Sequence, residues 1–156
     1  MSTRLKEKEE KILQILETLR EESSSGKPIV VEGIKDVEAL RELDVRGLFL
    51  TVKTGGKSFL EVLSEIEKTG ESEVILLLDF DRRGREGTKL LKQLLERARI
   101  KSNTKFWLKL SGLAGRDIQC IEGLTGYLRT LNAKIMAWGT TNNAYGKPQI
   151  RTDTEQ

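Results

Sequence analysis

Two aspartates at the end of an apolar run are the residues of this chain best placed to do chemistry. Residues 74–78 read Val-Ile-Leu-Leu-Leu and lead directly into Asp79-Phe80-Asp81. Five consecutive apolar residues are typical of a central strand in a parallel sheet, because such a strand is covered on both faces. While the chain stays extended, side chains two residues apart point the same way, so Asp79 and Asp81 can face one site. Paired carboxylates at the carboxyl end of a strand are ligands that suit Mg²⁺.

A third carboxylate follows a second apolar run. Ile29–Val31 leads into Glu32 and Gly33, and Asp36 then opens a helical segment as an N-cap or first-turn acid. If both strands lie in one parallel sheet, Glu32 joins Asp79 and Asp81 at its carboxyl edge. We therefore predict that these three acids bind a metal and carry any catalysis. The alternative is that they are solvated residues of turns and strand ends, where Asp is common.

The combination resembles the Toprim domain, which topoisomerases, bacterial-type primases, OLD-family nucleases and bacterial ribosomal-RNA-maturing ribonucleases share. The residues that carry the resemblance are Glu32-Gly33 with Asp36, and Asp79-Phe80-Asp81 with Gly84. Thr54-Gly55-Gly56, between them, looks like the Thr-Gly-Gly loop of the RNA-maturing branch. The resemblance covers residues 28 to 112 and implies Mg²⁺ as the cofactor, with Mn²⁺ as a substitute.

The sequence departs from the patterns of the families that it resembles at informative places. The RNA-maturing branch usually has lysine directly after Glu-Gly, whereas here Ile34 stands there and Lys35 follows. Topoisomerases tend to carry Asp-Pro-Asp-Arg-Glu-Gly-Glu, whereas here Phe80, Arg83 and Arg85 replace the proline and the two glutamates. Losing those acids counts against topoisomerase chemistry and favours a loop that holds phosphate.

Basic residues accompany the predicted metal site. Arginines and lysines run from the aspartate loop into the following helix, and lysines flank the double glycine, whose backbone N–H groups can cradle phosphate. Basic groups beside a metal fit a nucleic-acid backbone, although lysines at helical spacing also form ordinary solvated faces. The predicted nucleic-acid-binding residues are Lys35, Lys53, Gly55, Gly56, Lys57, Arg82, Arg83, Arg85 and Lys89.

Composition narrows the chemistry. The chain has 156 residues, a net charge of +3, no histidine and one cysteine, Cys120, which excludes an intramolecular disulfide framework and a cysteine-cluster zinc site. Without histidine, catalysis must use carboxylates, lysines, arginines and metal-bound water. No run approaches the ~18 apolar residues of a membrane span, and the charged N-terminus is unlike a signal peptide. We expect a cytoplasmic protein without a membrane partner.

Alternating strands and helices predict an α/β fold, a Toprim (Rossmann-like) domain with a mainly parallel four-stranded sheet flanked by helices. The predicted divisions are an N-terminal amphipathic helix and linker (1–27), the Toprim domain (28–133) and a polar, mobile tail (134–156). The first helix, about residues 4 to 22, carries an apolar stripe that could pack on the domain or on a second copy. Residues 105–110 are predicted as the fourth strand, and Asp117 as a helix cap. Phe59, Leu60, Leu63 and Ile66 are predicted to form the buried side of another helix.

Two functional classes remain. The first is a magnesium-dependent nucleic-acid phosphodiesterase, an RNA-processing nuclease, with RNA favoured over DNA. The second is a non-catalytic nucleic-acid-binding module in an RNA-processing or DNA-repair assembly. Residues 78–81 also resemble the nucleophile motif of haloacid-dehalogenase phosphatases, but Arg82-Arg83 stands where those enzymes have Gly-Thr, and no adjacent acidic pair follows.

Overall fold

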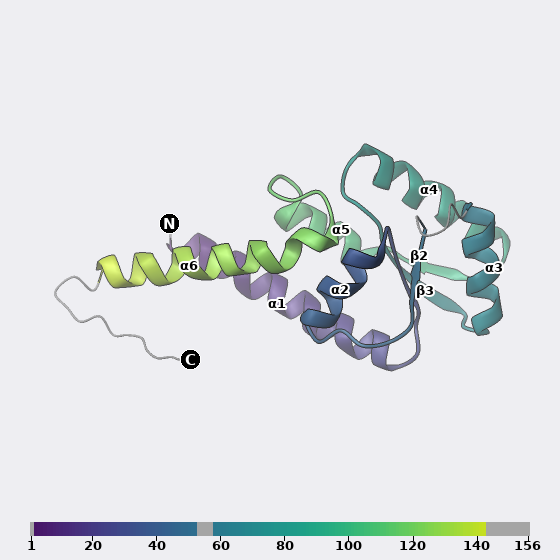
Figure 1. Cartoon of the computed structure of the whole chain (residues 1–156), viewed down its shortest axis with the longest axis horizontal. Helices are drawn as coiled ribbons and strands as arrows, with labels where there is room; N and C mark the ends of the chain where they lie inside the picture. The colour runs from purple at the N-terminus through teal and green to yellow at the C-terminus, as the bar shows by residue number, and fades with distance from the viewer. Residues whose placement is uncertain (1, 53–57, 143–156) are drawn as a thin grey trace.

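The computed structural model describes residues 2–52 and 58–142 of the chain. Its elements alternate between helix and strand in the central part and are helical at both ends (Figure 1). The elements are α1 (Ser2–Ser24), β1 (Ile29–Val31), α2 (Ile34–Glu42), β2 (Phe49–Thr51), α3 (Phe59–Thr69), β3 (Glu73–Leu77), α4 (Arg82–Arg97), β4 (Lys101–Asn103), α5 (Lys105–Ala114), the 3₁₀ turn η2 (Ile121–Gly123) and α6 (Leu124–Asn142).

The four strands form one sheet in the order β2-β1-β3-β4, and every pair is parallel. The predicted α/β fold with a parallel four-stranded sheet is therefore confirmed. β1 and β3 are the two central strands, and Val31 pairs with Leu77 at their ends. This register brings the residues that follow the two strands to the same edge of the sheet.

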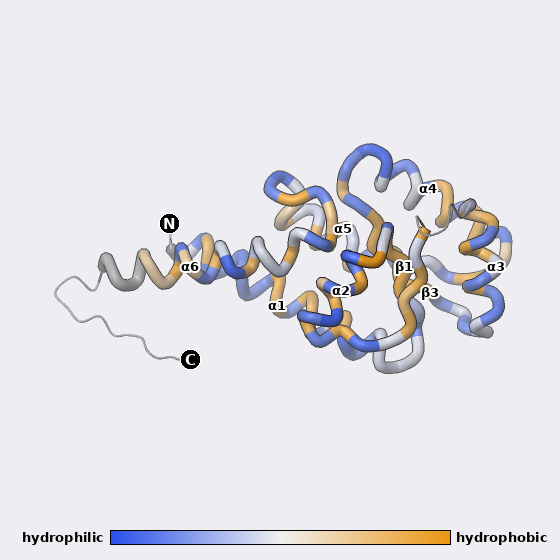
Figure 2. The backbone as a smooth tube through the Cα atoms, in the orientation of Figure 1, coloured by the Kyte–Doolittle hydropathy of each residue, from blue (hydrophilic) through white to orange (hydrophobic). Residues whose placement is uncertain are grey.

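The sheet is covered by a helical layer on each face, and alternate strand residues enter different layers. Ile29, Val31, Ile75 and Leu77 pack with residues of α1, α2, α5 and α6. Val30, Val74, Leu76 and Leu78 pack with residues of α3 and α4. Figure 2 shows hydrophobic residues along the central strands and a mixture of hydrophobic and hydrophilic residues along the helices around them. This two-sided burial explains why β1 and β3 are continuous apolar runs.

The two end helices lie side by side and extend away from the sheet (Figure 1). Ile12, Leu16 and Leu19 of α1 are fully buried, so the predicted apolar stripe packs within the chain. Helix α6 runs to Asn142, so residues 134–142 of the predicted tail are helical, and the rest of that tail lies outside the described residues. Within the described ranges, no helix is long and apolar enough to span a membrane.

The prediction that residues 105–110 form the fourth strand is wrong. That strand is Lys101–Asn103, and residues 105–110 begin helix α5. The buried residues of α5 follow helical spacing: Phe106, Trp107, Leu110 and Ala114. This helical pattern is stronger than the partial alternation on which the strand prediction rested. A three-residue edge strand is too short to give a period of its own.

Two smaller predictions also differ from the structure. Leu60 is 64% exposed, and Val62 instead packs in the core with Ile66, because the buried side of α3 is rotated from the predicted one. Asp117 caps no helix; its carboxylate accepts a hydrogen bond from the Tyr127 hydroxyl at 2.8 Å. The chain continues past it to η2 before α6 begins.

Helix α4 starts in very close contact with the loop that follows β3. A Cβ atom on Gly84 would lie 1.9 Å from the carbonyl oxygen of Asp79 and 2.5 Å from its carbonyl carbon. Such distances are far inside van der Waals contact, so only glycine allows the first turn of α4 to lie on the Asp79 backbone.

Gly84→Ala is therefore expected to destabilise the fold. The loop or the helix must move apart, and overpacking of this kind costs about 1–3 kcal/mol of unfolding free energy. Urea denaturation followed by circular dichroism measures the change. Gly112→Ala, within α5, is the matched control, because no described atom outside its own helix backbone lies within 4 Å of where its Cβ would stand. Replacing a helical glycine there should stabilise by about 0.5–1 kcal/mol. Equal stability of the two variants would contradict the close-contact argument.

Candidate metal centre

Glu32 and Asp79 meet at the carboxyl edge of the sheet. Glu32 directly follows β1, and Asp79 lies two residues beyond the end of β3. The Glu32 Oε2 atom accepts a hydrogen bond from the backbone N–H of Asp79 at 3.3 Å, and both side chains are partly buried. The parallel pairing of β1 and β3 thus places the first two predicted acids beside each other.

Asp81 has a different local role, because helix α4 begins directly after it. Its Oδ1 atom accepts a hydrogen bond from the N–H of Gly84 at 2.9 Å, which makes Asp81 the N-cap of α4. The cap stabilises the exposed N–H groups at the start of the helix. A carboxylate offers about four lone-pair positions, so one capping bond does not exclude a metal.

Asp36 is the most buried acid at this edge, with 5% of its surface exposed. Its Oδ2 atom accepts from the N–H of Gly33 at 3.0 Å, and its Oδ1 atom accepts from the N–H of Glu122 at 2.8 Å. The carboxylate therefore holds the start of α2 against η2. Two backbone donors and the positive end of α2 stabilise its charge.

Cys120 completes a compact group that sequence reasoning missed. One ligand atom from each of Asp36, Asp79 and Cys120 lies within 4.8 Å of the others. Burial raises the pKa of the Cys120 thiol, and the carboxylates of Asp36 and Asp79 raise that pKa further. Negative charges concentrated around a protonated thiol make this a place where a cation is electrostatically favoured.

Cys120 comes close because of a tertiary contact and not because of a local motif. The N–H of Phe80 donates to the carbonyl oxygen of Gln119 at 2.7 Å, so the two loops run side by side. Within the described ranges, the acids and cysteines that come this close together are Asp36, Asp79 and Cys120. Glu32 and Asp81 do not belong to this group. Asp79 belongs both to this group and to the metal-binding set predicted from the sequence.

The donor atoms fit a divalent cation. Carboxylate oxygens suit Mg²⁺ and Mn²⁺, whereas a thiolate favours softer metals, so participation of Cys120 would shift preference away from Mg²⁺. The set from the sequence (Glu32, Asp79, Asp81) and the compact group (Asp36, Asp79, Cys120) thus differ in the metal that each would select.

The arginines after Asp81 divide into three environments. Arg85 donates from Nη1 to the carbonyl oxygen of Phe80 at 3.0 Å, so it supports the loop. Arg82 forms an exposed ion pair with Glu86, 3.1 Å between Nε and Oε2. Arg83 is exposed and lines a hollow of about 350 Å³ together with Glu32. Of these three arginines, Arg83 is therefore the one that borders the same hollow as Glu32.

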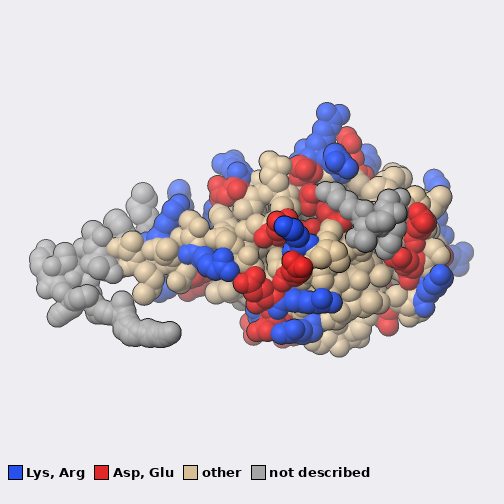
Figure 3. Space-filling view, viewed as in Figure 1, with Lys and Arg blue, Asp and Glu red and all other residues tan. Residues whose placement is uncertain are grey.

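The structure says less about the other residues predicted to bind nucleic acid. Lys35 and Lys89 are exposed, and Lys53, Gly55, Gly56 and Lys57 lie outside the described residues. Figure 3 shows basic side chains projecting over the start of α4, with acidic side chains beside them. The charge on this face is mixed, which agrees with the small net charge of the chain.

Comparisons with known proteins agree with this geometry. The Toprim domain family matches residues 27–106. A UPF0292 protein of Methanocaldococcus jannaschii is 38% identical over 120 residues, which cover 76% of this chain and 91% of that protein. A UPF0292 protein of Thermococcus kodakarensis is 31% identical over 123 residues, covering 78% of this chain and 87% of that one.

A protein of known structure from Aquifex aeolicus has a similar fold. Its TM-score is 0.58 at 26% sequence identity, and the similarity covers 70% of this chain and 94% of that one. Toprim domains bind divalent metals, and the acidic edge described above is where such a metal fits, so a metal-dependent role connected with nucleic acid is indicated. The chain belongs to the Toprim-domain proteins and, within them, to the UPF0292 family.

Proposed function

We propose that this protein is a divalent-metal-dependent phosphodiesterase that cleaves RNA. The observation that carries the proposal is the contact between Glu32 and the Asp79 backbone, which sets a potential proton acceptor beside the carboxylate that we propose as a metal ligand. Asp79 would bind the metal, with either Asp81 or the pair Asp36 and Cys120 completing the ligands. A metal bound there would polarise a phosphate and lower the pKa of a bound water.

The residues of the chain would divide the remaining work. Glu32 would accept a proton from the attacking water, because its carboxylate is held at the edge of the sheet by a hydrogen bond from Asp79. Arg83, which borders the same hollow as Glu32, would hold a phosphate oxygen of the substrate. Arg85 would act indirectly by fixing the Phe80 carbonyl and hence the loop. RNA is proposed as the substrate on the resemblance to the RNA-maturing branch, and magnesium or manganese as the metal.

A non-catalytic nucleic-acid-binding module is the second candidate, and one observation favours it. Asp81 caps α4, and both oxygens of Asp36 already accept backbone hydrogen bonds. If those bonds limit both residues as ligands, Asp79 and Glu32 would hold one metal weakly, which suits bridging to phosphate better than cleaving it. Such a module would act in an RNA-processing or DNA-repair assembly.

Asp79→Asn is expected to weaken Mn²⁺ binding at least tenfold, about 1.4 kcal/mol, because both ligand sets use this carboxylate. Isothermal titration calorimetry measures the affinity. Asp44→Asn, at an exposed aspartate beside Arg46, is the control and should bind as the wild type does.

Co²⁺ spectra then separate the two ligand sets. A sulfur-to-cobalt absorption band that disappears in Cys120→Ser would assign the thiol as a ligand. Its absence in the wild type, with Asp81→Asn binding weakly, would assign the set predicted from the sequence. Unchanged Mn²⁺ affinity in Asp79→Asn would remove both sets.

Glu32→Gln is expected to bind RNA normally but to cleave it at least tenfold more slowly, a lower bound since positioned acid–base groups contribute about 10²–10⁴-fold. Saturating metal should not restore the rate, because glutamine cannot take up the proton. Single-turnover cleavage of structured and single-stranded RNA, with DNA in parallel, provides the measurement. Glu67→Gln, on the exposed side of α3, is the control. Wild-type protein that binds RNA yet cleaves none of these substrates with any metal would favour the binding module.

A further inference from the structure

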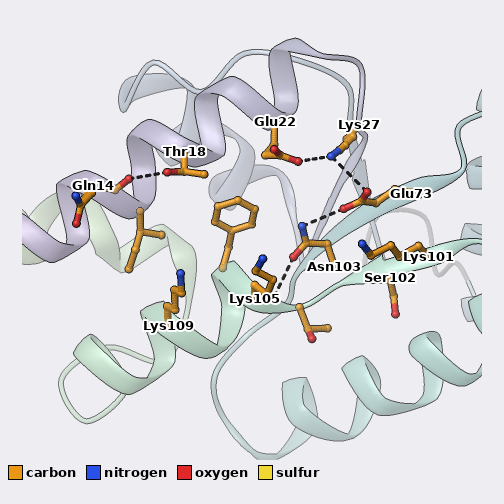
Figure 4. Close-up of a pocket in the computed structure, with 13 residues that line it drawn as sticks. Gln14, Thr18, Glu22, Lys27, Glu73, Lys101, Ser102, Asn103, Lys105 and Lys109 are labelled. Carbon is orange, nitrogen blue, oxygen red and sulfur yellow. Dashed lines mark hydrogen bonds and ion pairs between the residues drawn. The ribbon is translucent and has the colours of Figure 1, made fainter.

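A second hollow, of about 580 Å³, lies between α1, β4 and α5. It shares no residue with the candidate metal centre or with the smaller hollow beside Arg83. Figure 4 shows its side chains arriving from both sides, with Gln14 and Thr18 on α1 opposite Lys105 and Lys109 on α5. The volume falls within the range of about 300–1,000 Å³ that is common for small-molecule sites.

The lining carries a surplus of positive charge, with four lysines against two glutamates. The glutamates are both held by Lys27, which hydrogen-bonds Glu22 and lies 3.3 Å from Glu73. The hydrogen bond to Glu22 is the main reason that the pKa of Lys27 is raised. Burial raises the pKa of Glu73, but hydrogen bonds from Asn103 and Lys27 outweigh it, so the pKa lies below its usual value. Lys27 thus offsets one of the two glutamate charges, and the four lysines leave the lining with a net charge of +2.

The other three lysines form no such side-chain hydrogen bonds within the described residues, although the charge of Lys101 helps to lower the pKa of Glu73. Lys101, Lys105 and Lys109 line the hollow, and none of them forms an ion pair with a residue in the described ranges. Lys105 and Lys109 lie four residues apart on α5, where like charges repel each other. An anion between the three ammonium groups would relieve this repulsion.

The backbone adds to the same positive potential. Asn103 accepts from the N–H of Lys105 through Oδ1, and its amide donates to Glu73, so its orientation is fixed. Thr104 precedes α5 without capping it through its side chain, which leaves N–H groups of the first turn without a side-chain acceptor from that residue. The positive end of the α5 dipole thus lies at Lys105, one of the residues that line the hollow.

The rest of the lining suits an organic body attached to the anion. Ile15 and Phe106 contribute apolar surface, and Thr18 and Ser102 contribute hydroxyl groups. We propose that this hollow binds a phosphorylated small molecule of nucleotide size, with its phosphate held by Lys101, Lys105 and Lys109. The phosphate could come from a free nucleotide or from the end of a nucleic-acid strand. The site is independent of the proposed phosphodiesterase activity and needs no metal.

The test is an NMR titration of ¹⁵N-labelled protein in EDTA with inorganic phosphate, AMP and adenosine. AMP is expected to shift the amide signals of residues 101–109 saturably, phosphate to shift them more weakly, and adenosine to leave them unchanged. The combined variant Lys101→Gln, Lys105→Gln and Lys109→Gln should bind AMP at least tenfold more weakly. Its fold should persist because all three side chains are exposed.

The combination of Lys6→Gln, Lys68→Gln and Lys134→Gln, at three exposed lysines elsewhere, removes the same charge and is the matched control. A 5′-phosphorylated dinucleotide separates the two sources of phosphate: binding as tight as that of AMP assigns a strand end, and no binding assigns a free nucleotide. Equal AMP affinity in the two combined variants, or the absence of AMP-dependent shifts at residues 101–109 in the wild type, would overturn the proposal.

Discussion

The position of Asp79 depends on the contacts that fix the loop between β3 and α4. The indole Nε1 of Trp107 donates to the carbonyl oxygen of Leu78 at 2.8 Å and lies 3.3 Å from that of Asp79. On the other side, the first turn of α4 presses on the same backbone at Gly84. Asp81 then caps α4, so a single short loop ends the strand, presents the carboxylate and begins the helix. Geometry fixed before a ligand arrives reduces the cost of ordering the site.

The contacts that fix this loop also bring distant parts of the chain to the candidate metal centre. Trp107 belongs to α5, and the carbonyl of Gln119, which accepts from Phe80, belongs to the segment after α5. The same segment carries Cys120 to Asp79 and Glu122 to Asp36. Three acids and a thiol at one sheet edge repel one another when ionised, and a divalent cation turns that repulsion into attraction.

The sequence was sufficient for the parts of this account that rest on local patterns. The two apolar runs predicted β1 and β3, and their parallel pairing follows from the alternation of strands and helices, so the meeting of Glu32 and Asp79 could be anticipated. The role of Asp81 as the N-cap of α4 could not be anticipated, because the point at which α4 begins depends on its close packing at Gly84. The position of Cys120 beside Asp79 could not be predicted either. It depends on a backbone hydrogen bond between Phe80 and Gln119, which leaves no signature in the sequence. The fourth strand was misplaced because β4 is three residues long and the following helix carries the stronger apolar pattern.

The central claim is that the edge formed by Glu32, Asp79 and their neighbours is where this protein binds a divalent metal. Paramagnetic broadening of backbone amide signals by substoichiometric Mn²⁺ tests it most directly, since the ion broadens the signals nearest to it first. The account predicts that the amides of Gly33, Phe80 and Cys120 lose intensity first, while those of Glu10 and Glu17 on the acidic outer surface of α1 keep theirs. Earliest loss along α1, or uniform loss over the whole chain, would contradict it.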